Sequence, residues 1–190
     1  MAGATIEFED RKALAAIGAA VAVLRSPDRM FRDMGEALLI IHRKRFRAQT
    51  SPDGEKWQAL SPAYQRRKKK NRDRVLVLDG YLRSTLRYQV EGGDLLFGSD
   101  RKYAAIHQFG GDIQQKGREH SLFFKQRKSG KVGKRFVKKE KSNFEQRVKI
   151  AAHTITMPAR PFLGIGLADA EKLEAIAKRH LARALRSGRA

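Results

Sequence analysis

The distribution of positive charge limits the folding of this chain more than any other feature of its sequence. Seven Lys and Arg side chains lie between residues 66 and 74, opposed only by Asp73, and twelve lie between residues 116 and 147, opposed by three Glu. Like charges at this density repel over about 8 Å at physiological salt. We therefore expect the 66–74 block to be excluded from the core, and both groups to be solvated, mobile or neutralised by a polyanion.

Both cation groups are candidates for contact with DNA or another polyanion. The whole chain has 41 Lys and Arg against 20 Asp and Glu, a net charge of +21. Basic patches of this kind are typical of nucleic-acid binding, but a solvated loop explains them equally well, and both interpretations stay open. The candidate contact residues are Arg66, Arg67, Lys68, Lys69, Lys70, Arg72, Arg74, Lys125, Arg127, Lys128, Lys131, Lys134, Arg135, Lys138 and Lys139.

Length and apolar content indicate one folded domain without a membrane span. A chain of 190 residues is long enough to bury a core. The absence of cysteine excludes disulfides and thiolate metal sites. The longest apolar run, residues 13–24, is well short of the roughly 20 residues that cross a bilayer.

Helices are predicted at both ends of the chain. Leu14, Ile17, Val21 and Leu24 recur at helical spacing, and Pro27 separates them from a second apolar stripe over residues 31–41. A third amphipathic pattern covers residues 167–185. Between the second and third helices, residues 49–62 have the composition of an irregular segment anchored by Trp57. Residues 103–109 read as a short helix that ends at Gly110, with His107 hydrogen-bonded.

Two β-hairpins are predicted in the middle of the chain. Residues 86–90 and 95–98 alternate apolar and polar side chains around a Gly-Gly turn, and residues 122–124 and 134–137 form a second candidate pair. The predicted fold class is α+β, with N-terminal helices, a small antiparallel sheet with a projecting basic β-hairpin arm, and a C-terminal helix packed on the sheet. We expect a single domain over residues 1–190, with a helical extension at 1–27 and the arm at 114–156.

No pattern in the sequence predicts catalysis or a bound cofactor. The five histidines have no metal-site spacing, and the carboxylates form no pair that is typical of a magnesium site. The two Gly-Gly pairs lack the Lys-Ser/Thr of a phosphate loop. We therefore predict no catalytic residue, no metal, no cofactor and no enzyme activity.

Six short motifs, taken in order, resemble one known family. They are Arg45-Phe46 with Gln49; Pro52-Asp53-Gly54 with Trp57; residues 60–64 before a basic run; Leu78 with Gly80 and Leu82; Gly98-Ser99 before residues 103–111; and residues 158–164 before a terminal helix. In this order and spacing they resemble the phage virion morphogenesis family, the tail-completion proteins of Mu-like and related tailed phages. The resemblance covers roughly residues 30 to 185.

The resemblance implies a structural protein of the virion neck that completes the tail or joins it to the head. It implies no catalysis. Junctions of this kind follow the rotational symmetry of their neighbours, so the expected assembly is a homo-oligomeric ring, with a hexamer favoured. Expected partners are neighbouring neck, connector and tail-tube proteins and packaged DNA, held through non-specific phosphate contacts; no membrane is involved. The expected location is the head–tail junction of the virion, after assembly in the host cytoplasm.

Several apolar and aromatic motif residues have either core packing or subunit contact as their candidate role. They are Trp57, Tyr103, Ile106, Phe109, Arg160, Phe162 and Leu163. Two alternatives to a neck protein also stay open. One is a basic nucleic-acid-binding protein, which explains the charge but not the motif order, and the other is a head-morphogenesis factor that is not retained in the virion.

Overall fold

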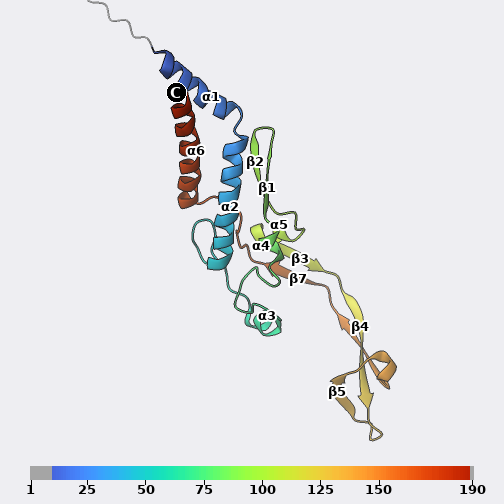
Figure 1. Ribbon diagram of the computed structural model, residues 1–190. Helices are drawn as coiled ribbons and strands as arrows, with labels where there is room; N and C mark the ends of the chain where they lie inside the picture. The colour runs from blue at the N-terminus through green and yellow to red at the C-terminus, as the bar shows by residue number, and fades with distance from the viewer. Residues whose placement is uncertain (1–9, 189–190) are drawn as a thin grey trace, which may run out of the picture. The chain divides into compact units, whose positions relative to one another are not determined.

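The computed structural model of this chain describes residues 10–188 (Figure 1). Contacts within it define two compact units: unit 1 comprises residues 1–109 and 159–190, and unit 2 is Gly110–Pro158. Unit 1 holds the helices α1 (Arg11–Arg25), α2 (Asp28–Ala48), α3 (Pro62–Arg67), α4 (Tyr81–Ser84), α5 (Ala104–Phe109) and α6 (Leu167–Ser187), and the strands β1 (Arg87–Glu91) and β2 (Asp94–Gly98). Unit 2 holds β3 (Gly111–Gln115), β4 (Arg118–Gln126), β5 (Val132–Phe136), the 3₁₀ turn η1 (Lys139–Lys141), β6 (Phe144–Ile150) and β7 (His153–Met157).

The α+β fold class is confirmed, and two of its details differ from the prediction. The strands form three separate antiparallel sheets, β1-β2, β3-β7 and β5-β4-β6, where one small sheet was expected. Helix α6 packs on α1 and α2, and not on a sheet. Its buried stripe explains this, because His180 lies 2.8 Å from Asp33 on α2 and Gly188, just after α6, approaches the backbone of Ala16 on α1.

Helix α1 lies within the predicted extension 1–27, of which residues 1–9 fall outside the described part. The Oδ1 atom of Asp10 caps the helix by accepting a hydrogen bond from the amide of Ala13 at 3.2 Å. Pro27 separates α1 from α2, as its fixed backbone angle predicts. The helix packs on α6 through Ala16, which is 2 % exposed.

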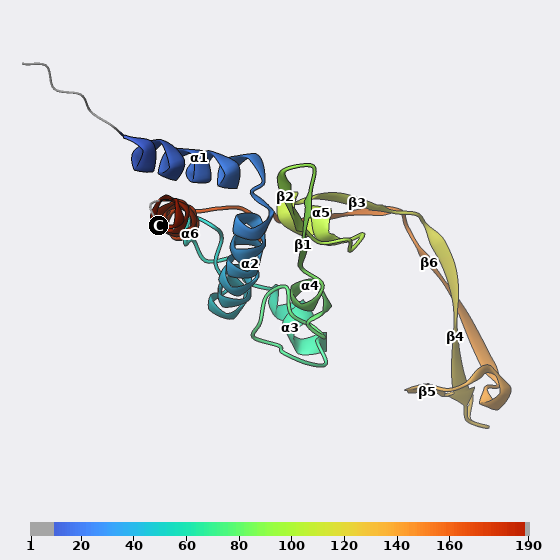
Figure 2. The ribbon, with the colours of Figure 1, turned by 45° about the horizontal axis from the view of Figure 1, so that its top comes forward.

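The first predicted hairpin is confirmed as β1-β2, and it packs on α2 (Figure 1, Figure 2). Gly92 and Gly93 both have positive φ, which a tight hairpin turn requires. On α2, a Cβ at Gly35 would overlap the ring of Tyr88 on β1. Glycine inside a helix costs about 1 kcal/mol relative to alanine, and here it permits close contact between helix and hairpin.

Unit 2 is built from strands that the sequence pattern revealed only in part. Strand β4 pairs with β5, with Phe124 opposite Phe136, as expected for the second hairpin. It also pairs along its length with β6, and β3 pairs with β7; neither of these pairings was predicted. All residues of unit 2 are described, and none of them is buried. That this unit projects as an arm stays a prediction.

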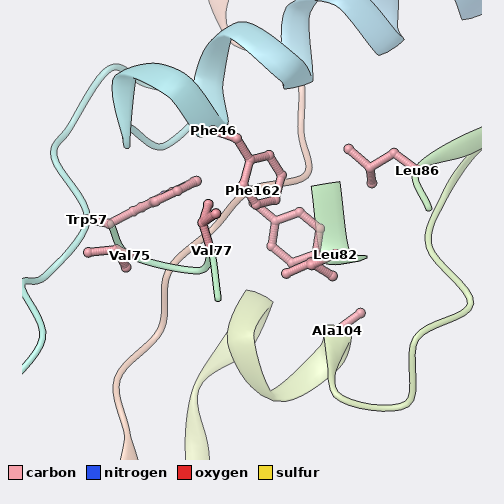
Figure 3. Packing of buried hydrophobic residues seen from close by; sticks show 8 residues of the cluster. All are labelled: Phe46, Trp57, Val75, Val77, Leu82, Leu86, Ala104 and Phe162. Carbon is pink, nitrogen blue, oxygen red and sulfur yellow. The ribbon is translucent and has the colours of Figure 1, made fainter. Parts of the chain in front are cut away.

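The core of unit 1 forms around two aromatic rings (Figure 3). Phe162 is 0 % exposed and Phe46 is 1 % exposed, and their ring centroids lie 5.6 Å apart. Trp57 packs edge-on against Phe46 with a centroid distance of 5.4 Å. The remaining buried members of the cluster are Val75, Val77, Leu82, Leu86 and Ala104. The core therefore joins α2 to segments that are distant in the sequence.

Beside this core, His42 is buried as a neutral side chain. It is 1 % exposed, its ring lies against Phe97 with a centroid distance of 4.4 Å, and its Nδ1 atom donates to the carbonyl of Leu38 at 2.7 Å. The Nε2 atom is buried without a partner among the described residues. Burial, with a smaller contribution from the nearby Arg45, lowers the pKa of His42 to about 4 against the opposing effects of the Leu38 hydrogen bond and Asp169.

We expect His42 to make the free energy of unfolding depend on pH between about 6.5 and 4. Across this window the unfolded chain binds a proton on the imidazole and the folded chain does not, so acid destabilises the fold by roughly 3 kcal/mol in total. His42→Asn keeps a donor for Leu38 and removes the titration. In urea unfolding at a series of pH values, the variant should be less stable at pH 7 and should lose less stability on acidification.

His120→Asn provides the matched control, because it makes the same substitution at an exposed imidazole. An identical slope for the wild type and His42→Asn in this pH window would contradict the prediction.

Candidate functional site

Residues 158–164, one of the six motifs, pass through the interior of unit 1 and are held there by a buried arginine from α2. The Nη1 atom of Arg45 donates to the carbonyl of Phe162 at 2.9 Å and to that of Gly164 at 3.0 Å. Its Nη2 atom lies 2.7 Å from Oδ2 of Asp169 in the first turn of α6. One side chain thus connects α2, the 158–164 segment and α6.

The ion pair between Arg45 and Asp169 is largely removed from water. The two side chains are 5 % and 13 % exposed. Burial lowers the pKa of Arg45, and the Asp169 carboxylate opposes this shift. Asp169 Oδ2 also accepts from the amide of Gly166 at 3.4 Å, and a Cβ on Gly166 would collide with the carbonyl of Pro52. The charges are therefore satisfied only when α6 begins at this position.

A second pair of side chains attaches the irregular segment before α3 to residues 158–164. Nε1 of Trp57 donates to the carbonyl of Pro161 at 2.8 Å. In the reverse direction, Arg160 donates from Nε to the carbonyl of Gln58 at 2.9 Å and from Nη2 to that of Ala59 at 3.4 Å. Burial lowers the pKa of Arg160. The hydrogen bonds to these backbone carbonyls replace the water that the buried guanidinium has lost.

Gln108 on α5 binds the same segment in the way that a neighbouring strand does. Its Oε1 atom accepts from the amides of Phe162 and Leu163, both at 2.9 Å, and its Nε2 atom donates to the carbonyl of Leu163 at 3.1 Å. The amide of Arg160 donates to the carbonyl of His107 at 2.8 Å. We refer to Arg45, Trp57, Gln108 and Arg160 as the clamp.

The predicted packing residues occupy different environments. Trp57, Arg160 and Phe162 are buried, and Ile106 and Leu163 are half-buried. Tyr103 is 41 % exposed and Phe109 is 78 % exposed. The structure thus brings Trp57, Arg160, Phe162 and Leu163 together and leaves Tyr103 and Phe109 at the surface of the chain.

His107 differs from its expected role. Its Nδ1 atom is buried without a hydrogen-bond partner among the described residues, so the prediction of a hydrogen-bonded His107 is wrong for this atom. Burial and then the charge of Arg160 lower its pKa. The edge of its ring lies against Tyr103 with a centroid distance of 6.0 Å. Gly110 follows α5 with a φ of 72°, as expected at a helix C-terminus.

The expectation that the whole 66–74 block stays out of the core is wrong for Lys68. This side chain is 5 % exposed, and its ammonium donates to the carbonyls of Asn71 and Arg74. Burial lowers its pKa. It therefore closes the 68–74 turn. The other candidate cations of the block are exposed: Arg66, Arg67, Lys69, Lys70, Arg72 and Arg74.

In unit 2 every candidate cation is exposed. They are Lys125, Arg127, Lys128, Lys131, Lys134, Arg135, Lys138 and Lys139. In unit 1, Lys70 lies 2.9 Å from Asp79, and this hydrogen bond raises the pKa of Lys70. Both side chains of that pair are largely in water, where such a pair contributes little to stability.

The described residues offer little for a metal or cofactor. No group of three or more His, Asp or Glu side chains among residues 10–188 is placed to hold a metal. A groove of about 360 Å³ runs along α2, the 50–54 turn and the start of α6, but its central charges, Arg45 and Asp169, already bind each other. No helix in the described range is long and apolar enough to cross a membrane.

Sequence reasoning did not identify the role of Arg45 and Gln108. Both belong to the recognised motifs, but their partners lie more than fifty residues away in the sequence. The available signal was an arginine on the apolar stripe of a helix, because a charged residue at a core position requires a buried partner.

Comparison with known proteins gives one finding. A sequence model of the phage virion morphogenesis family matches residues 8–182. The search of curated proteins and the search of solved structures found no match.

The clamp yields a stability prediction for Arg45→Met. This variant leaves Asp169 paired only with the more distant Lys172, at 3.5 Å, and removes the donor of two carbonyls, so the free energy of unfolding should fall by about 3–5 kcal/mol in urea titrations. Adding Asp169→Leu should restore part of the loss, because it removes a largely buried carboxylate that has lost its closest partner. Arg47→Met, at an exposed position on the same helix, should change stability by less than about 0.5 kcal/mol. Equal effects at positions 45 and 47 would contradict this role of Arg45.

Proposed function

We propose, from the premise that the chain belongs to the phage virion morphogenesis family, that it is a structural protein of the virion neck. In this proposal it completes the tail or joins it to the head, as a homo-oligomeric ring around the DNA channel. Family membership establishes a role in assembly of the phage virion. The position at the neck and the ring are the proposed part.

The observation that carries the proposal is the use of the family motifs inside the fold. The polar groups of the clamp residues form hydrogen bonds with backbone carbonyls, backbone amides and Asp169, all within unit 1. An active site instead needs polar groups that are free to meet a substrate. Motif residues whose polar groups are occupied in this way stabilise the folded shape of unit 1. A protein that fits between neighbours in a particle requires a fixed shape of this kind. We therefore assign no reaction to the chain.

The exposed cations support a position next to packaged DNA. All eight candidate cations of unit 2 and six of the seven in the 66–74 block are exposed. Double-stranded DNA carries one negative charge per roughly 1.7 Å, and contacts with its phosphates are independent of base sequence. A protein that surrounds a passing genome needs this kind of non-specific contact. Lys68 is outside the proposed contact set, because its ammonium is bound to carbonyls.

The direct test of the proposal is to locate the chain in purified virions. We expect mass spectrometry to detect it in finished particles, and electron cryomicroscopy to place it as a ring at the head–tail junction. Particles made without the chain should accumulate as separate filled heads and tails. Its absence from joined, infectious particles would favour the head-morphogenesis alternative and contradict the neck assignment.

DNA contact has its own test in the turn between β4 and β5. Replacing Arg127, Lys128 and Lys131 with Gln should weaken binding to random-sequence duplex DNA, and it should reduce the slope of log K against log salt by up to about 3. The control replaces Arg43, Arg47 and Arg183, three exposed cations of unit 1, which removes the same charge. Fluorescence anisotropy at several salt concentrations measures both variants. An equal loss in both would show that total charge, and not this turn, governs affinity.

A further inference from the structure

Helix α1 exposes a row of large apolar side chains. The exposed fractions are 68 % for Leu14, 56 % for Ile17, 40 % for Val21 and 58 % for Leu24. These four residues, which we name the α1 stripe, are spaced by three and four positions, so they share one face of the helix. The contact with α6 uses another face, where Ala16 is buried. The helix therefore buries Ala16 and leaves these four large side chains exposed.

The segment that carries the α1 stripe has no net charge. Residues 1–27 contain three acidic side chains, Glu7, Glu9 and Asp10, and three basic ones, Arg11, Lys12 and Arg25. Arg11 lies three positions before Leu14 and Arg25 four positions after Val21, so both flank the stripe. No charged residue occurs between residues 13 and 24. The α1 stripe is therefore an apolar surface on a neutral segment of a chain whose net charge is +21.

The three-stranded sheet of unit 2 has an uncovered apolar face. Phe136, Phe124 and Phe144 lie directly opposite one another across β5, β4 and β6, and the Phe124 and Phe136 ring centroids are 5.2 Å apart. Alternation along the strands places Leu122, Val148 and Ile150 on the same side. We name these six residues the sheet face. Phe136 is 70 % exposed, and none of the six is buried.

The opposite side of this sheet carries charged side chains, which pair with neighbouring side chains and are in contact with water. It carries Glu119 paired with Lys149 at 3.1 Å, and Glu145, which accepts from Ser121 at 2.6 Å. These two Glu are the only carboxylates of the three strands, so the sheet face has none, while Arg118 and His120 border it. The sheet face is therefore complemented by an apolar partner that brings no net positive charge.

We propose that the α1 stripe of one copy docks on the sheet face of a neighbouring copy, a contact that rests on the proposed ring. A helix lying on a sheet is a stable way to bury both apolar surfaces. The lengths agree, because the fifteen residues of α1 extend about 22 Å and the seven of β6 about 23 Å. Residues 1–27 have no net charge, so the contact adds no charge repulsion to that within unit 2.

Contact between two sheet faces is less compatible with the net charge of unit 2 than contact between a sheet face and the α1 stripe. Unit 2 has thirteen Lys and Arg against four Asp and Glu, so two sheet faces in contact bring together two net charges of +9. The α1–sheet contact joins two different surfaces, so in a pair one copy keeps a free α1 stripe and the other keeps a free sheet face. Contacts of this class build rings when the rotation closes.

The test uses two single variants and their mixture. Ile17→Glu disrupts the α1 stripe and Phe136→Glu disrupts the sheet face. Light scattering after size exclusion should show the wild-type protein as an oligomer and each variant as a monomer. An equal mixture of the two should form a dimer, because the Ile17→Glu copy retains an intact sheet face and the Phe136→Glu copy an intact helix. A local disturbance of the substituted sheet does not affect this rescue.

Two controls substitute positions that are exposed but lie outside the contact. Ala22→Glu is on α1 away from the stripe, and Arg135→Gln points to the charged side of the sheet; both variants should assemble like the wild type.

Three outcomes overturn the contact: a monomeric wild type, assembly of either Glu variant, or a mixture that stays monomeric. If Ile17→Glu still forms rings and enters virions, the contact is wrong and the neck function stands. If the wild-type chain is absent from virions, the neck function fails independently of this contact.

Discussion

The fold of unit 1 depends on satisfying the buried guanidinium of Arg45. An arginine placed among apolar side chains is strongly unfavourable unless each N–H group that leaves water finds an acceptor. Its acceptors come from residues 162, 164 and 169, which are brought to α2 from the far end of the chain. The requirement therefore fixes the path of the 158–164 segment and the start of α6. The aromatic core then packs around a backbone that polar contacts have already positioned.

Elements with a regular apolar pattern could be predicted from the sequence, and elements that depend on distant partners could not. The β1-β2 hairpin follows from alternation and a Gly-Gly turn. Strands β3 and β7 have mostly polar side chains, and backbone pairing with each other defines them. The burial of Lys68 could not be predicted for the same reason. Its neighbours in the sequence are solvated cations, and the carbonyls that bind its ammonium are brought to it by the 68–74 turn. For the candidate site, the sequence indicated which residues matter but not which contacts they make.

The two units differ in how far they bury their large apolar side chains. Unit 1 has a core in which Phe46 and Phe162 are almost completely removed from water. Unit 2 has a comparable supply of phenylalanine on β4, β5 and β6, yet buries none of it. A three-stranded sheet with one apolar face is near the minimum for independent stability, and covering that face adds to it. Unit 2 therefore has the composition of an interface, whose apolar side chains become buried when the assembly forms.

Under the proposed ring, salt acts in opposite directions on the two kinds of contact. Each added copy brings a charge of +21 toward others of the same sign, and screening by salt lowers this repulsion. Contact with DNA loses affinity as salt rises, because the release of condensed counterions into a more concentrated solution gains less entropy. The apolar contact between copies is itself nearly insensitive to moderate salt, since its driving force is removal of apolar surface from water. A ring formed around DNA satisfies both conditions, because the phosphates neutralise the cations that otherwise keep the copies apart.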